Sequence, residues 1–232
     1  EGGEWIPQAR DVEGRRELAV RSRLLVNACG PWADQVNARD AVRTAHRHVL
    51  SKGVHLLVDR LTPSRRVLTF FADDGRLFFV IPMGPKTCIG TTDTRVERPV
   101  VGVSPEDRRF VLDNINKRLR LPRPIEERDV VAERCGVRPL VVDARGGSGG
   151  DWMHLSRRHA IETDASLRHV TIFGGKLTDC LNVGEEMCAE ARRLGLSLPF
   201  PDRVWYGEPP PAVRDEYFHQ ARLMRLDAMT SP

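Results

Sequence analysis

Two consecutive glycines between an apolar segment and an amphipathic helix constrain this chain more than any other feature. Residues 170–173 suit a buried strand, Gly174 and Gly175 follow, and residues 178–194 carry apolar side chains at helical spacing. Because glycine has no Cβ, the backbone of this turn can approach a ligand closely. The start of the helix adds free N–H groups and the positive end of the helix dipole. The pattern predicts either a site for an anionic group or an ordinary strand–helix connection.

Lys176 favours the first of these interpretations, because it places a positive charge directly after the glycines. The segment Phe-Gly-Gly-Lys-Leu-Thr at residues 173–178 therefore suits a phosphate or the anionic edge of a ring. The alternative is a surface lysine on an ordinary turn, and residue chemistry alone leaves both interpretations open.

Strand signals dominate the middle of the chain. Asp73-Asp74-Gly75 lies between two apolar runs, and Asp-Gly in that context predicts a hairpin. Neighbouring runs of similar composition extend the hairpin into an antiparallel meander. The strands that we expect here are residues 53–58, 67–71, 77–81 and 87–91.

Helices are predicted on both sides of further strands, which makes the fold class α+β. Ser104 suits an N-cap and Pro105 the first helical position, and Pro122 ends the helix that follows. A Gly-rich loop is expected at residues 146–150. The other expected elements are a hairpin of residues 5–12 and 17–27, a short helix at 32–37, strands at 130–135, 140–142 and 152–157, and a helix after the prolines at 209–211.

Composition argues against several functional classes. Charged residues make up 29% of the 232 residues, but both signs are interleaved and the net charge is +4, which argues against nucleic-acid binding. The five cysteines include no Cys-x-x-Cys pair, so neither a zinc site nor a disulfide framework is predicted, and a reducing compartment fits. His46 and His48 lack a further ligand nearby, so no metal site is predicted. No apolar stretch approaches the roughly 18 residues of a spanning helix.

Arg138 is the second candidate site residue, because it lies between constrained and apolar neighbours in Gly-Val-Arg-Pro-Leu. Its planar fork suits bidentate binding of a carboxylate or a phosphate. The alternative, which the local sequence favours, is a structural ion pair with a nearby acid. Thr91, Thr92 and Asp93 bind a ligand or close a turn, and residue chemistry favours the turn.

Taken together, these segments resemble the FAD-dependent glycerol-3-phosphate dehydrogenases over about residues 17–195. Each segment is weak alone, but their order and spacing around the meander are specific. No Gly-x-Gly-x-x-Gly fingerprint occurs in the chain, so the resemblance places that motif upstream of Glu1. The segments are Val-Asn-Ala-Cys-Gly-Pro-Trp at 26–32, Ile-Gly-Thr-Thr-Asp at 89–93, Gly-Val-Arg-Pro-Leu at 136–140 and Phe-Gly-Gly-Lys-Leu-Thr at 173–178.

The resemblance implies an antiparallel-sheet substrate domain joined to part of a Rossmann-like FAD domain, of the type found in D-amino-acid oxidase and glycerol-3-phosphate dehydrogenase. The intact protein would then be α/β overall. Both ends of the chain look cut, and the family's remaining active-site histidine and arginine are expected upstream, so the chain alone is expected to be inactive. The implied divisions are a remnant of the FAD domain at 1–45, the substrate-binding sheet at 46–142, a return to the FAD domain at 143–197, and a linker with the start of a truncated helical domain at 198–232.

The activity implied by the resemblance is oxidation of sn-glycerol 3-phosphate to dihydroxyacetone phosphate, with hydride transfer from C2 to FAD. Electrons would pass to the quinone pool, and the cytoplasmic enzyme would contact the inner face of the cell membrane peripherally. Whether it forms a homo-oligomer stays open. Alternatives are a glycerol-3-phosphate oxidase that makes hydrogen peroxide, a non-catalytic truncated product, and an amine or amino-acid oxidase. Lys176 beside Arg138 argues against the last, because two cations suit a dianionic phosphate.

Site residues are carried over by motif. Arg138 and Lys176 are implied as catalytic and substrate-binding residues, and the roles of residues 91–93 stay unassigned. Many relatives continue the last motif with Thr-Tyr-Arg, whereas this chain has Asp179-Cys180-Leu181, which puts side-chain contacts there in doubt. The residues implied to contact FAD are Asn27, Ala28, Gly30, Gly174, Gly175, Lys176, Leu177 and Thr178.

Overall fold

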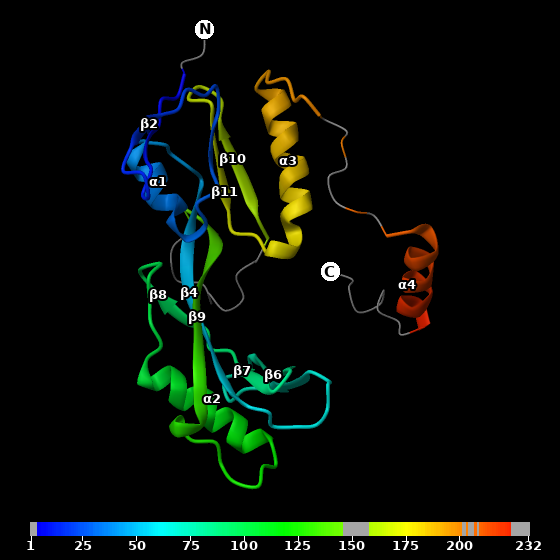
Figure 1. The fold of residues 1–232 in the computed structure, drawn as a ribbon. Coiled ribbons are helices and arrows are strands. Elements are labelled where there is room, and N and C mark those ends of the chain that lie inside the picture. Colours follow the sequence, from blue (N-terminus) through cyan, green and yellow to red (C-terminus); the bar gives the residue numbers. More distant parts are fainter. Residues whose placement is uncertain (1–3, 146–157, 201–202, 204–206, 208, 224–232) are drawn as a thin grey trace. The chain divides into compact units, whose positions relative to one another are not determined.

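The computed structural model describes residues 4–145, 158–200, 203, 207 and 209–223 (Figure 1). Contacts divide the chain into one unit of residues 1–196 and a second of residues 197–232. The first unit combines antiparallel sheets with helices, which confirms the predicted α+β class. Among the described helices, none has the length and apolar character needed to cross a bilayer.

A six-stranded antiparallel sheet forms the lower part of the first unit in Figure 1. Its central strand, β4, pairs with β7 and β8 on one edge and with β9 along the other. The predicted hairpin is confirmed: Gly75, at φ +81°, turns the chain between β5 and β6. The strands are β4 (His46–Asp59), β5 (Leu68–Phe71), β6 (Leu77–Met83), β7 (Lys86–Gly90), β8 (Thr94–Val96) and β9 (Val130–Asp143).

β9 corrects one expectation. Instead of separate strands at 130–135 and 140–142, a single strand runs beside β4, from Asp143 opposite His46 to Val130 opposite Val58. Pro139 does not interrupt it, because β4 is the only described partner of β9 and a proline is tolerated on a strand with a free edge. Arg138 therefore lies within a strand and not in a break between two strands.

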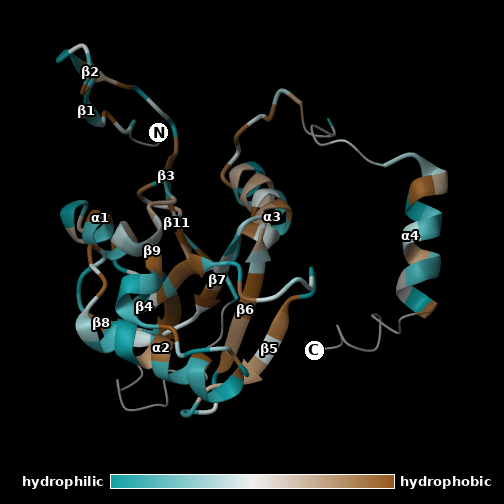
Figure 2. Ribbon diagram, turned by 60° about the horizontal axis from the view of Figure 1, so that its bottom comes forward, coloured by the Kyte–Doolittle hydropathy of each residue, from teal (hydrophilic) through white to brown (hydrophobic). Residues whose placement is uncertain are grey.

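The hydrophobic core lies between one face of this sheet and helix α2 (Pro105–Arg118). The predicted cap is confirmed: the Ser104 hydroxyl accepts the N–H of Asp107, whose carboxylate accepts the N–H of Ser104. Figure 2 shows predominantly hydrophobic strands β5 and β6 and a largely hydrophilic α2. Buried core residues include Val54, Leu56, Val58, Phe78, Val80, Ile89, Val111, Leu112 and Ile115.

A three-stranded sheet forms the rest of the first unit. β3 (Leu25–Asn27) runs parallel to β11 (His169–Phe173), and β11 pairs antiparallel with β10 (Ala160–Asp164). β8 and β10 were not expected. The strand predicted at 152–157 and the loop at 146–150 lie outside the described residues. The remaining elements are β1 (Gln8–Arg10), β2 (Glu17–Ala19), η1 (Gly30–Trp32), α1 (Ala33–Arg39), η2 (Glu127–Asp129), η4 (Leu177–Asp179) and α3 (Cys180–Arg193).

The second unit contains helix α4 (Pro211–Leu223), which begins at the last of the three prolines, as predicted. Val213 and Tyr217 lie one turn apart on this helix, and both side chains are exposed. The third and fourth positions of the expected stripe, Ala221 and Met224, have side chains outside the description.

Candidate active site

The two faces of the β4–β9 pair differ in chemistry. Residues that lie opposite each other in antiparallel strands project to the same face. The face that carries Val54 and Leu56 packs on α2. The other face brings three pairs together: Ser51 with Arg138, Gly53 with Gly136, and His55 with Arg134. Gly53 and Gly136 have no side chains, so this pair leaves a shallow depression between the polar side chains of the other two pairs. We call this depression the glycine floor.

A cavity of about 650 Å³ lies on this second face. Its size suits a small organic substrate. Two of its lining residues, Cys88 and Ile81, belong to neighbouring strands and lie opposite each other. The lining is Gly53, His55, Ile81, Met83, Cys88, Arg134, Cys135, Gly136, Val137 and Arg138.

Another cavity, of about 320 Å³, lies at the end of β4 and carries different chemistry. Its Arg60 donates to the carbonyls of Thr62 and Gly84, and its Arg123 pairs with Asp129. These arginines hold the surrounding loops, so we place the candidate site in the larger cavity.

Arg138 lies across the glycine floor. A Cβ added to Gly53 would overlap its guanidinium group, so the glycine allows the guanidinium to lie against β4 in this position. Nη2 donates to the Thr91 hydroxyl at 3.1 Å, and Nη1 lies 3.7 Å from a carboxylate oxygen of Asp93. Asp93 also accepts from the hydroxyl of Ser51. The structure thus joins two of the sequence motifs, and the ion pair predicted as the alternative for Arg138 is formed within the site.

His55 is a site residue that the sequence analysis missed. Burial lowers the pKa of its imidazole, and the charges of Arg138 and Arg134 lower it further. His55 is therefore neutral at neutral pH and can accept a proton. Its position two residues after Gly53 in a strand was the available signal, but without the register nothing connected it with Arg138. An active-site histidine was expected only upstream of Glu1.

Gly174 and Gly175 form a turn, called the glycine turn below. It packs against β9 close to Arg138. Gly174 and Gly175 have φ of +62° and +89°, in the region that favours glycine. A Cβ on Gly174 would overlap a methyl group of Val141 and lie 3.1 Å from the carbonyl oxygen of Arg158. Close packing and backbone conformation both require glycine at this position. No described contact joins Lys176 to Arg138.

Replacing Gly174 with alanine is expected to destabilise the intact protein by about 2–5 kcal/mol. Positive φ costs about 1–2 kcal/mol for a residue with a Cβ, and overpacking costs about 1–3 kcal/mol. Urea unfolding measures the loss. Gly184 is the matched control, because it lies within α3 with open space around it, so its change to alanine should stabilise by about 0.5–1 kcal/mol. Equal effects of the two changes would contradict the packing argument.

The start of η4 presents exposed groups beside this turn. The side chains of Lys176, Leu177 and Thr178 are exposed, and Leu177 is 89% accessible. Within the described residues, the N–H groups of Gly175 and Lys176 donate to no acceptor. Two free amides, a lysine and an exposed leucine can together contact a flat ligand with an anionic edge.

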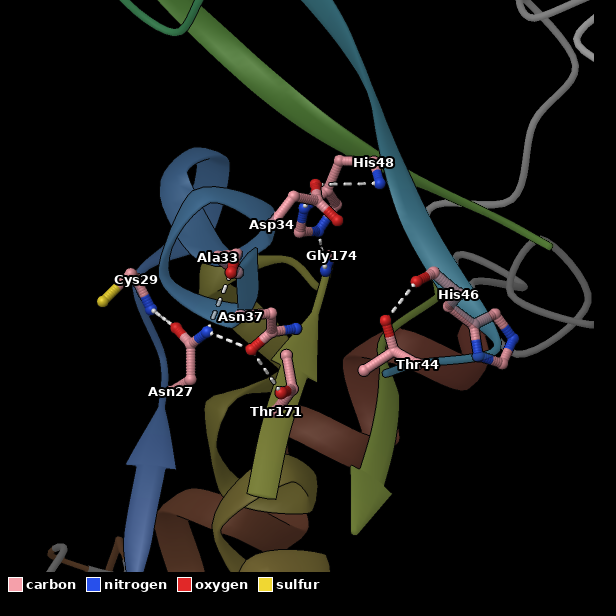
Figure 3. A network of polar contacts seen from close by, with 10 residues as sticks. All are labelled: Asn27, Cys29, Ala33, Asp34, Asn37, Thr44, His46, His48, Thr171 and Gly174. Carbon is pink, nitrogen blue, oxygen red and sulfur yellow. Dashed lines mark hydrogen bonds and ion pairs between the residues drawn. The ribbon is translucent and has the colours of Figure 1, made fainter. Parts of the chain in front are cut away.

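Asn27 holds the loop after β3 from inside (Figure 3). Its buried side-chain amide donates to the carbonyl of Ala33 at 2.9 Å and to Oδ1 of Asn37 at 2.7 Å. Its carbonyl oxygen accepts the N–H of Cys29 at 3.2 Å. Ala28 is exposed and Gly30 is half-buried, so these two residues are the accessible part of the predicted segment.

His159 forms an ionic cluster beside Gly175. Its Nδ1 lies 2.6 Å from Asp179, which precedes α3, and its Nε2 lies 3.1 Å from Glu186 within α3. Burial disfavours the charged imidazole, but the hydrogen bonds to both carboxylates outweigh burial and raise the pKa of His159 above 6.5. Asp179, which departs from the pattern of many relatives, therefore serves as a partner of His159.

The His159 cluster is expected to depend on pH. Because the folded pKa is raised, its contribution to stability is complete below about pH 6.5 and is lost as the pH rises through the folded pKa. Histidine NMR titration should place His159 above 6.5 and His55 below 6.5 in the same spectra. The change Asp179→Asn should lower the pKa of His159. A titration of His159 below that of His55 would refute the assignment.

Comparison with known proteins gives a consistent family. Residues 2–175 match the model of the family described as FAD dependent oxidoreductase. Aerobic glycerol-3-phosphate dehydrogenase of Bacillus subtilis (strain 168) is 35% identical over 184 residues, which are 76% of this chain and 31% of that protein. The mitochondrial glycerol-3-phosphate dehydrogenase of Macaca fascicularis is 32% identical over 182 residues, 77% of this chain and 24% of that protein. The chain thus spans less than a third of these curated relatives.

Solved structures agree on the fold. The glycerol-3-phosphate dehydrogenase from Bacillus halodurans complexed with FAD superposes with a TM-score of 0.68 at 30% identity, covering 83% of this chain and 36% of that one. The amino acid oxidase NikD superposes with a TM-score of 0.51 at 15% identity, covering 86% and 51%. The second likeness shows the fold alone.

Proposed function

This chain belongs to the family of FAD-dependent oxidoreductases, and from that membership we propose that the intact protein oxidises sn-glycerol 3-phosphate to dihydroxyacetone phosphate. The observation that carries the proposal is Arg138 lying over the Gly53–Gly136 floor of the larger cavity. The names of relatives at 32–35% identity support this substrate.

The residues around the glycine turn fit a flavin edge. Gly175 and Lys176 offer free N–H groups, and Gly174 lets the turn lie close against β9. We assign the accessible Ala28 and Gly30, together with Leu177 and Thr178, to contacts with FAD. The side chain of Asn27 supports their loop from within. When bound, FAD supplies the acceptor for the hydride that leaves C2 of the substrate.

Arg138 and Lys176 supply the positive charge that a dianionic substrate needs. We assign Lys176 to the phosphate and Arg138 to the polar groups around C2, where its fork is already oriented by Thr91 and Asp93. Neutral His55 is positioned on the same face to take the proton of the C2 hydroxyl. Loss of that proton and of the C2 hydride together yields the ketone.

Anaerobic reduction of the flavin tests the proposed substrate. Adding sn-glycerol 3-phosphate to the purified intact protein should bleach its flavin absorbance, whereas glycine should not. Bleaching by glycine but not by glycerol 3-phosphate would favour the amino-acid oxidase alternative and overturn the proposal.

We further propose that electrons pass from the flavin to the quinone pool at the inner face of the membrane, through peripheral contact. The bacterial relatives are named dehydrogenases and not oxidases, which favours an acceptor other than oxygen. Turnover with a quinone analogue but without oxygen consumption is the expected result. Stoichiometric hydrogen peroxide would instead identify an oxidase.

A further inference from the structure

His48 on β4 uses both of its ring nitrogens although its side chain is only 1% exposed. Nε2 accepts the N–H of Gly174 at 3.0 Å, and Nδ1 lies 3.0 Å from a carboxylate oxygen of Asp34 on α1 (Figure 3). The ring also packs against Phe173, with centroids 5.1 Å apart. One side chain therefore connects α1, β4 and the end of β11.

These contacts determine the tautomer of His48. The Gly174 amide is a donor, so Nε2 has no hydrogen and Nδ1 carries it. Nδ1 then donates to Asp34, which also accepts the backbone N–H of His48 at 3.1 Å. A carboxylate that holds one nitrogen of an imidazole fixes the ring orientation and presents the other nitrogen as an acceptor.

The hydrogen bond from Gly174 to His48 restricts the backbone conformation of the glycine turn. Glycine restricts the backbone least of all residues, so two glycines in succession need external contacts to hold one conformation. The bond to His48 turns the N–H of Gly174 inward, toward β4. The N–H groups of Gly175 and Lys176, which have no acceptor among the described residues, remain available for a ligand.

We propose that His48 is a positioning residue for the flavin-binding turn: oriented by Asp34, it holds Gly174 so that the following amides face FAD. The inference rests on the proposed role of this turn in binding FAD and does not depend on the identity of the substrate. His48 itself touches neither substrate nor cofactor in this assignment.

Two isosteric variants separate positioning from packing. In His48→Gln the side-chain carbonyl occupies the place of Nε2 and still accepts from Gly174. In His48→Asn the amide occupies the place of Nδ1, so it keeps Asp34 and loses Gly174. With the intact holoenzyme, we expect H48N to raise the dissociation constant of FAD about tenfold, as for one lost hydrogen bond, and H48Q to raise it less than about threefold.

Two readouts need no substrate. They therefore test the role of His48 even if the protein does not oxidise glycerol 3-phosphate. The first is the FAD dissociation constant, and the second is hydrogen exchange of the Gly174 amide, which should be protected in wild type and H48Q but not in H48N. Hydrogen exchange of the Gly174 amide can be measured even for a variant that binds no FAD. Equal loss of FAD affinity and of protection in both variants, or no change in either, would overturn the proposal.

Discussion

Replacing Arg138 with methionine in the intact protein is expected to lower kcat/KM for sn-glycerol 3-phosphate by about 30- to 1,000-fold. Removing one charged partner from a partly buried, hydrogen-bonded contact costs about 2–4 kcal/mol, and about 1.4 kcal/mol changes a rate tenfold. Arg138 is half-buried, and its fork is oriented by Thr91 and Asp93 over Gly53. Methionine fills similar space but offers no donor to the substrate.

Two further substitutions show whether the loss of kcat/KM comes from the guanidinium group of Arg138. Arg138→Lys keeps the charge but loses the planar fork, so we expect it to recover only part of the activity. Arg109 provides the matched control, because it is exposed on α2 and its change to methionine should leave kcat/KM within about twofold. Steady-state rates with a quinone analogue measure all three, and flavin content shows whether each protein is loaded. An R138M enzyme within threefold of wild type would remove Arg138 from the mechanism.

Much of the fold was predictable because its signals are local. The cap at Ser104, the hairpin turn at Gly75 and the glycines before η4 each follow from the conformational preferences of a few neighbouring residues. The structure confirms all three. Where a feature depends on residues close in sequence, elementary physical chemistry was sufficient.

The features that sequence reasoning missed depend on pairing between distant segments. Gly136 and Pro139 looked like strand breaks, yet β9 is continuous because β4 supplies partners along its length. His55 joins the site only through the register that places it opposite Arg134. His48 appeared to be one of two unremarkable histidines, and its role needs both Asp34 and Gly174. Nothing in the sequence specifies these contacts before the register is known.

Strand β4 also explains the second large expected effect, which is on the free energy of unfolding. Lys52 lies between Ser51 and Gly53 but projects to the opposite face of β4, where it forms an ion pair with Asp107. Lys52 is 7% exposed and Asp107 is 5% exposed. Asp107 also accepts the N–H of Ser104 at 2.8 Å in the cap of α2. The Lys52–Asp107 ion pair thus connects the start of α2 to β4, the strand that carries Gly53 and His55 of the candidate site.

Lys52→Met is expected to destabilise the protein by about 3–5 kcal/mol, because it leaves the buried Asp107 carboxylate without its cation. Lys86→Met is the matched control. Lys86 pairs with Asp59, whose side chain is 82% exposed, so losing that pair should cost about 0–1 kcal/mol. Urea unfolding measures both variants, and hydrogen exchange of the α2 amides shows where the loss occurs. Similar costs for the two lysines would show that burial does not govern the Lys52 pair.

The pH dependence separates loss of charge pairing from loss of packing. Burial would raise the pKa of Asp107, but hydrogen bonds from Lys52 and Ser104 outweigh it and lower the pKa below 3.8. The contribution of Asp107 is therefore complete above about pH 3.8 and is lost as the pH falls through the folded pKa. In K52M the carboxylate loses its main stabilising partner, so the variant should gain stability relative to wild type as the pH falls. Adding Asp107→Asn to K52M should restore part of the loss at neutral pH, because the buried charge is then removed. If the double variant were no more stable than K52M, the penalty would come from packing and not from the unpaired carboxylate.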